Sequence, residues 1–268
     1  MLTITDHNGI ERALGNVQAA RLTHPCRTYG DGGTWMIARR NWPDMIGMVT
    51  SDLDHHRYLP PVHDQGSIGQ CNAEACAAAV EYCRAAAGLP YVQLSPGDLY
   101  ARINRGVDRG SLLEDGLAEA EGAGIGTAAT CGLLWRRGMP LATAEERGRY
   151  RVLERWLCPT FDHCMAAVLC GFAVVAGVLW HDTYTPDGDG WLPGRGAGRA
   201  GGHALVGYAP AMRGACYGIW CQNSWGAGWG LDGRCVLPET AFAGPVGGWW
   251  AVRQVVTESG DLPPLKVA

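Results

Sequence analysis

The stretch Gln65-Gly-Ser-Ile-Gly-Gln-Cys71 runs directly into Asn72-Ala-Glu-Ala-Cys-Ala-Ala-Ala-Val-Glu-Tyr82, and the two together decide the fold of this chain. A glycine-rich loop places one cysteine at the start of an alanine-rich helix, expected over residues 72–87 and closed by Gly88. A helix N-terminus carries partial positive charge and free N–H groups, so a thiol there is biased toward the thiolate. A single cysteine is more often a small buried residue than a nucleophile, so a catalytic role needs partners elsewhere in the chain.

Length and composition describe a globular protein with one large domain or two lobes. The chain has 268 residues, 47% hydrophobic and 18% charged, with a net charge of −4 that gives no electrostatic case for nucleic acid or membrane partners. It holds eleven cysteines, an odd number, so at least one thiol is free or bridged to another molecule. The N-terminus lacks the pattern of a signal peptide, and we therefore expect a cytoplasmic protein with mostly reduced thiols.

Helical patterns fill the first half of the chain, and strand patterns fill the end. Besides the helix that follows Cys71, helices are expected from Ser95-Pro, over 112–123 and over 143–157. Strands are expected near 203–208, 216–222 and 233–238. This segregation indicates an α+β protein of two lobes with a cleft between them.

Residues 164–180 carry no charge, which is close to the minimum for a membrane span. Gly171 divides them, and the residues after it are β-branched, so a helix, a tight turn and a buried strand are expected instead.

Two distant residues supply the partners that a catalytic cysteine needs. His203 follows Cys71 by 132 residues and Asn223 follows it by 152, which matches the spacing of catalytic His and Asn in papain and the cathepsins. The blocks Gly202-His-Ala-Leu-Val-Gly-Tyr208 and Gln222-Asn-Ser-Trp-Gly-Ala-Gly-Trp-Gly230, with the loop before Cys71, resemble the papain-like cysteine peptidases over roughly residues 59–240. The resemblance implies a helical left lobe, an antiparallel β-rich right lobe and an active site in the cleft.

The same resemblance implies a role for each matching residue. Cys71 would be the nucleophile, His203 its base, Asn223 the orienter of the imidazole, and Gln65 an oxyanion donor beside the Cys71 N–H. It implies hydrolysis of protein or peptide substrates through a thioester, without a metal or cofactor. Substrate binding is implied for five residues: Gly69, Gly110, Ser111, Gly202 and Trp225. Gly110 and Ser111 would pair with the substrate backbone as an added strand, and Trp225 would shield the His–Asn hydrogen bond from water.

The loop and helix start depart from the family pattern at three positions. Ile68 replaces a cysteine of a family disulfide, Asn72 replaces an aromatic residue, and Glu74 replaces another aromatic residue. These changes make the helix start more polar than is usual. The neighbouring substrate subsites therefore cannot be inferred from the family.

The resemblance divides the chain into three parts. Residues 59–255 form the peptidase domain, and 256–268 form a C-terminal tail. Residues 1–58 form an N-terminal extension without a long amphipathic helix in its first 50 residues, and this extension is a candidate short pro-segment lying over the cleft.

Two other functions fit the same residues. One is an amide, isopeptide or peptidoglycan hydrolase, or an acyl transferase, that uses the same thioester. The other is an inactive binding module. The glycine-rich run 196–201 lacks the strand-to-helix context of a dinucleotide site, and the His-rich stretch that includes His63 is expected to be a solvated loop.

Overall fold

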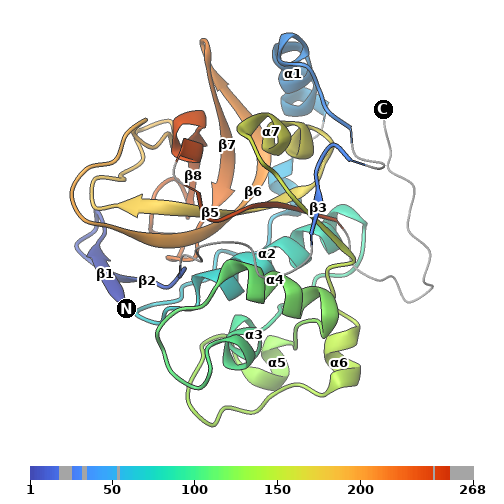
Figure 1. Cartoon of the computed structure of the whole chain (residues 1–268), viewed down its shortest axis with the longest axis vertical. Coiled ribbons are helices and arrows are strands. Elements are labelled where there is room, and N and C mark those ends of the chain that lie inside the picture. The colour runs from blue at the N-terminus through green and yellow to red at the C-terminus, as the bar shows by residue number, and fades with distance from the viewer. Residues whose placement is uncertain (18–25, 32–34, 53–54, 244, 254–268) are drawn as a thin grey trace.

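The computed structural model describes residues 1–17, 26–31, 35–52, 55–243 and 245–253. The predicted C-terminal tail, 256–268, lies outside them. Figure 1 shows the two predicted parts, with the strands gathered in the upper half and most helices in the lower half. The α+β prediction is confirmed.

The larger sheet has seven strands among the described residues, in the order β3-β4-β9-β5-β6-β7-β8. Every neighbouring pair is antiparallel except β3 with β4. Its strands are β3 (Arg27–Thr28), β4 (Glu154–Leu157), β5 (Ala173–His181), β6 (Ala200–Arg213), β7 (Cys216–Gln222), β8 (Arg234–Pro238) and β9 (Pro245–Arg253). The three strands predicted near the end of the chain are confirmed as β6, β7 and β8. A separate antiparallel hairpin consists of β1 (Leu2–Thr5) and β2 (Glu11–Leu14).

The described helices lie mainly between the hairpin and the sheet in sequence. They are α1 (Trp42–Asp52), α2 (Cys71–Ala86), α3 (Pro96–Ile103), α4 (Leu113–Gly122), α5 (Ala128–Cys131), α6 (Ala144–Gly148) and α7 (Phe161–Leu169), with short 3-10 turns at Arg39–Asn41, His55–Tyr58 and Glu239–Ala243. The predicted helix start at Ser95 is confirmed, since its hydroxyl accepts the Asp98 N–H at 3.0 Å.

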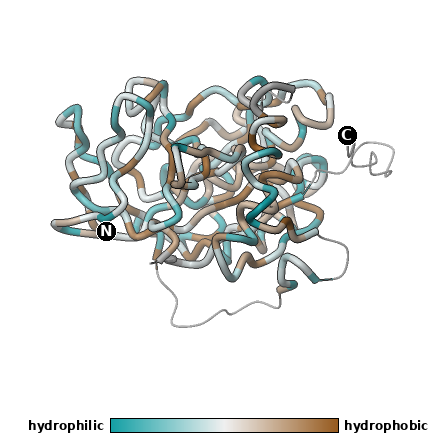
Figure 2. The backbone as a smooth tube through the Cα atoms, turned by 90° about the horizontal axis from the view of Figure 1, so that it is seen from above, coloured by the Kyte–Doolittle hydropathy of each residue, from teal (hydrophilic) through white to brown (hydrophobic). Residues whose placement is uncertain are grey.

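Helix α2 is the central element of the core. Its first twelve residues, 71–82, are all buried, and the nonpolar ones among them pack in one cluster with residues of β5 and β6. Alanine side chains let the helix approach the sheet closely, and the Tyr82 hydroxyl donates to the Tyr208 carbonyl at 3.3 Å. In Figure 2 the hydrophobic segments lie mostly inside the molecule. The start of α2 is therefore held firmly at the boundary between helices and sheet.

The uncharged stretch 164–180 forms helix α7, a turn and strand β5, as predicted. Gly171 makes the turn with φ of +81°, a conformation that glycine adopts without steric cost. Within the described part of the chain, no helix combines the length and apolar character that crossing a membrane requires.

Two expectations about local structure are wrong. Only residues 144–148 of the predicted helix 143–157 are helical, because Glu154–Leu157 forms strand β4 between β3 and β9. Residues 1–50 were expected to lack a long helix, yet α1 begins at Trp42. This tryptophan is fully buried and contacts the rings of Phe161 and Tyr217, so part of the N-terminal extension belongs to the core.

Candidate active site

The predicted nucleophile is the first residue of helix α2. Cys71 is fully buried. The residue before it, Gln70, donates its amide to Glu74 Oε1 at 2.6 Å and accepts the Trp135 N–H at 2.8 Å. Glu74 thus has a structural partner at this helix start, where the family pattern has an aromatic residue. These bonds fix the loop that delivers the cysteine.

The predicted base and its orienter lie together on neighbouring strands. His203 on β6 and Asn223, directly after β7, are joined by a 2.8 Å contact between Nε2 and Oδ1. Asn223 Oδ1 also accepts the backbone N–H of Ser224, so it is an acceptor and the imidazole must donate from Nε2. The other ring nitrogen, Nδ1, is buried and has no hydrogen-bond partner among the described residues. Nδ1 is therefore free to accept a proton.

Ser224 links the two amide side chains of the site, and the sequence analysis missed it. Its hydroxyl donates to Gln65 Oε1 at 2.6 Å, while its N–H donates to Asn223 Oδ1 at 2.8 Å. The Ser224 carbonyl also accepts the Gln65 N–H at 2.9 Å. Because Oε1 is engaged by the hydroxyl, the Nε2 donors of Gln65 point away from Ser224, as an oxyanion donor requires. The only signal for Ser224 in the sequence was its position directly after Asn223, the predicted orienter of the imidazole.

Tryptophan side chains enclose the imidazole. The Trp225 ring lies 4.7 Å from the His203 ring, between centroids, and the Trp180 ring lies 5.2 Å away in an edge-to-face arrangement. Both indoles are buried. Trp225 lies where its predicted shielding role requires, and Trp180 adds a second aromatic neighbour from strand β5.

The expected thiolate bias of Cys71 is wrong for this closed state. Burial raises the pKa of the thiol to about 12, although the backbone N–H groups of Gly15, Ala204 and Asn72 act in the opposite direction. Burial also lowers the pKa of His203 to about 4. The helix N-terminus cannot offset the loss of water around the sulfur, so both groups are neutral here.

The water is excluded by the N-terminal segment, which runs across the site. The Gly15 carbonyl accepts the Ser111 N–H at 2.8 Å, and the Val17 N–H donates to the Ser111 carbonyl at 2.8 Å. Gln65 Nε2 donates to the Ala13 carbonyl at 3.2 Å, and the Asn16 N–H donates to the Gly202 carbonyl at 3.0 Å. Residues 13–17 thus bind Gln65, Ser111 and Gly202 through main-chain groups; we call them the strap.

The strap fits only because of a glycine at its centre. A Cβ atom on Gly15 would lie 2.0 Å from the Gly69 carbonyl oxygen. Similarly, a Cβ on Gly110, whose φ is +77°, would lie 2.1 Å from the Gly15 oxygen. Gly69 and Gly110, both predicted to bind substrate, therefore form two close walls around the strap.

A buried arginine anchors the hairpin that precedes the strap. Arg12, 3% exposed, contacts Asp6 at 2.9 Å and Asp64 at 2.7 Å, and donates to the Trp225 carbonyl at 2.8 Å. Asp6 has a lowered pKa because hydrogen bonds from Ile10, Arg12 and Asn8 outweigh the opposing effect of burial. The anchor joins the hairpin before the strap to residues adjoining Gln65 and Ser224.

No known family profile and no curated protein sequence matches this chain. Among solved structures, xylellain, a cysteine protease from Xylella fastidiosa, is similar with a TM-score of 0.67 and 18% identity, over 95% of this chain and 98% of that one. The fold is that of the papain-like cysteine proteases. Digestive procathepsin L2 from Tenebrio molitor is similar with a TM-score of 0.62 and 20% identity, over 91% of this chain and 78% of that chain. Bromelain from Ananas comosus is similar with a TM-score of 0.56 and 18% identity, over 79% of this chain and 96% of that chain.

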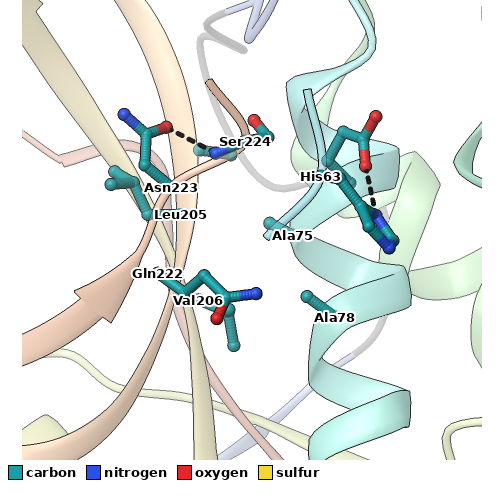
Figure 3. Close-up of a pocket in the computed structure, with 10 residues that line it drawn as sticks. His63, Ala75, Ala78, Leu205, Val206, Gln222, Asn223 and Ser224 are labelled. Atoms are coloured by element: carbon teal, nitrogen blue, oxygen red, sulfur yellow. Dashed lines mark hydrogen bonds and ion pairs between the residues drawn. The ribbon is translucent and has the colours of Figure 1, made fainter. Parts of the chain in front are cut away.

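Behind the site, this papain-like fold holds a buried polar cluster that was wrongly expected to be solvated. His63 is 7% exposed, and its Nδ1 lies 2.9 Å from Glu74 Oε2, while its Nε2 lies 3.9 Å from Glu81 Oε2. Figure 3 shows His63 across a small cavity from Gln222 and Asn223, with α2 between the loop and the strands. Within the loop 61–65, His63 and Gln65 are buried while Pro61 and Asp64 are exposed, and Asp64 pairs with Trp225 in an antiparallel bridge.

Burial and hydrogen bonding shift the pKa values of this cluster. Burial raises the pKa of Glu81 to about 7. For His63, burial acts to lower the pKa, but the hydrogen bond and charge of Glu74 raise it above the usual value. In the described part of the chain, no group of three or more His, Cys, Asp or Glu side chains is arranged to hold a metal ion. All eleven cysteines lie in that part, and none of them forms a disulfide bond there.

Proposed function

We propose that this chain is a cysteine peptidase that hydrolyses peptide bonds through a thioester on Cys71. The observation that carries the proposal is the His203–Asn223 hydrogen bond at 2.8 Å, which leaves a buried, unpaired Nδ1 on the imidazole. The N–H of Ala204, the residue after His203, hydrogen-bonds the Cys71 sulfur and acts to lower the pKa of the thiol against the larger effect of burial, which raises it. This contact beside His203 supports the proposal that Cys71 and His203 act in one site.

The chemistry follows from these groups. His203 accepts the thiol proton at Nδ1, and the thiolate sulfur bonds to the substrate carbonyl carbon. The imidazolium returns the proton to the leaving nitrogen as the C–N bond breaks, and a thioester remains on Cys71. His203 then takes a proton from water, which attacks the thioester and releases the carboxylic acid and the thiol.

Gln65 supplies the second half of the oxyanion site. Its Nε2 would donate to the negative oxygen formed in both steps, beside the backbone N–H of Cys71. In the closed state Nε2 donates to the Ile68 carbonyl at 2.8 Å and to the Ala13 carbonyl of the strap at 3.2 Å. The strap carbonyl therefore occupies a donor that the substrate oxygen needs.

The strap supports a second part of the proposal: residues 1–17 hold the peptidase in an inactive state. They engage Gln65 and both main-chain groups of Ser111, and Gly15 leaves no room for another chain beside Gly69. Catalysis therefore requires that the strap leave the cleft or be removed. The sequence prediction of a pro-segment places this role on residues 1–58, and these contacts support it for the first 17.

Active-site labelling tests the function. An epoxide inhibitor should modify Cys71 in protein whose strap has been displaced, and Cys71→Ala should abolish turnover. A panel of peptides, isopeptides and cell-wall fragments separates a general peptidase from the alternative hydrolases and transferases. An accessible Cys71 that resists labelling, with no turnover of any substrate, would instead indicate a binding module.

A further inference from the structure

Asn72 is the residue after the nucleophile and replaces an aromatic residue of the family pattern. It is fully buried, and its Nδ2 donates to the Ser111 carbonyl at 2.7 Å and to the Ser111 hydroxyl at 3.1 Å. Both N–H donors of the buried Asn72 amide therefore bond to Ser111, which lies 39 positions later in the sequence. These two bonds indicate that Asn72 holds the backbone of Ser111 in place.

Ser111 is the residue whose backbone receives the strap. Its N–H donates to Gly15 and its carbonyl accepts from Val17, both at 2.8 Å. A carbonyl oxygen has two lone pairs, so it can accept from Asn72 on the inside and from a docked chain on the outside. Asn72 and any strand that pairs with Ser111 therefore donate to the same Ser111 carbonyl oxygen, from opposite sides.

The segment that carries this carbonyl needs a fixed partner. Gly110, directly before Ser111, has a φ of +77°, and glycine allows the backbone to rotate more freely than any other residue. A hydrogen bond from the rigid start of α2 removes that freedom before a chain binds, which lowers the cost of binding.

The same amide also contacts the nucleophile. Its Oδ1 lies 4.0 Å from the Cys71 sulfur, within reach of a weak S–H hydrogen bond. One side chain therefore ties the edge that pairs with a peptide backbone to the atom that would attack the peptide.

We propose that Asn72 is a positioning residue for peptide binding, which holds the Ser111 carbonyl in the orientation that accepts a backbone N–H. The expected effect on KM rests on the proposed function, whereas the expected effect on peptide binding does not depend on it. The ligand class is an extended polypeptide that adds a strand at Ser111.

The test uses full-length protein carrying Gly15→Ala, because the clash of the added Cβ with the Gly69 oxygen is expected to displace the strap. The probe is a synthetic peptide of residues 9–17, whose contacts with Ser111 are known from the structure. Calorimetry should give a Kd about 5-fold higher when Asn72→Ala is added, the typical effect of one lost hydrogen bond. Asn72→Asp, which keeps the shape but loses the donors, should weaken binding at least as much.

Asn104→Ala is the matched control, because Asn104 is also a buried asparagine that bonds a nearby backbone N–H, that of Gly106 at 2.8 Å. It should leave the Kd unchanged. With any peptide that is turned over, Asn72→Ala should raise KM about 5-fold with kcat within 2-fold.

An unchanged Kd in both Asn72 variants would overturn the inference, as would an equal loss in Asn104→Ala. Absence of turnover in every variant would contradict the proposed function only, because the Kd measurement decides the role of Asn72 by itself.

Discussion

Replacing Gly15 by alanine should open the site without altering any catalytic group. The new Cβ would lie 2.0 Å from the Gly69 carbonyl oxygen; the backbone fixes the position of the Cβ, and the oxygen is itself a backbone atom, so no side-chain rotation relieves the clash. Overpacking of this kind typically costs about 1–3 kcal/mol, and about 1.4 kcal/mol corresponds to a factor of ten. We therefore expect the fraction of molecules with the strap displaced to rise about 5- to 150-fold.

Alkylation by iodoacetamide, followed by mass spectrometry of each cysteine peptide, measures this opening. Cys71 should react faster in Gly15→Ala by the same factor, since exposure to water also relieves the burial that raises its pKa. The exposed thiols Cys26 and Cys216 serve as internal references whose rates should not change. Gly122→Ala, where a Cβ meets nothing within 4 Å, is the matched variant. Equal Cys71 rates in folded Gly15→Ala and wild-type protein would refute the inhibitory strap.

Three further predictions follow from the contacts. Ser224→Ala removes the bond that orients Gln65 and should lower kcat about 5-fold with little change in KM; an unchanged kcat would contradict this role. Arg12→Ala removes the anchor and should speed Cys71 labelling in the same assay, whereas slower labelling would argue against it. The folded-state pKa of Glu81 is raised from 4.5 to about 7, so the stability that this group contributes is present below pH 4.5 and is lost as the pH rises to about 7. The resulting fall in the free energy of unfolding is about 3 kcal/mol. The raised pKa of His63 acts in the same direction as the pH rises above the usual His value. Urea unfolding at pH 5 and pH 8 measures that fall, and Glu81→Gln should flatten it.

Two kinds of sequence pattern predicted the fold and the site well. One is local, within a single helix, and the other is a set of motifs that are far apart but occur in a fixed order. The helix after Cys71 could be located because alanine-rich composition and a closing glycine act within a few residues. His203 and Asn223 could be paired with Cys71 because their neighbours also resemble a family. The structure places the last two within hydrogen-bond distance of each other.

The remaining features depend on long-range packing that leaves no local pattern. Residues 154–157 look polar and helical in isolation, but become a strand because β9 offers a partner. The sequence around His63 is typical of a loop, but His63 packs against the carboxylates of Glu74 and Glu81 on α2, which lie 11 and 18 positions later in the chain. The strap is an ordinary short segment whose binding depends on Gly69 and Ser111, which are distant in sequence. Likewise, Asn72 looked like a departure from the family until its contact with Ser111 was known.

The central claim is that Cys71 forms a covalent acyl-enzyme with a peptide substrate. Intact-protein mass spectrometry of Gly15→Ala protein, quenched in acid during turnover of a peptide, should show a mass increase equal to the acyl part of that substrate. The added mass should map to Cys71 and disappear in Gly15→Ala/Cys71→Ala, together with all turnover. Peptide cleavage that persists without Cys71 would contradict the account.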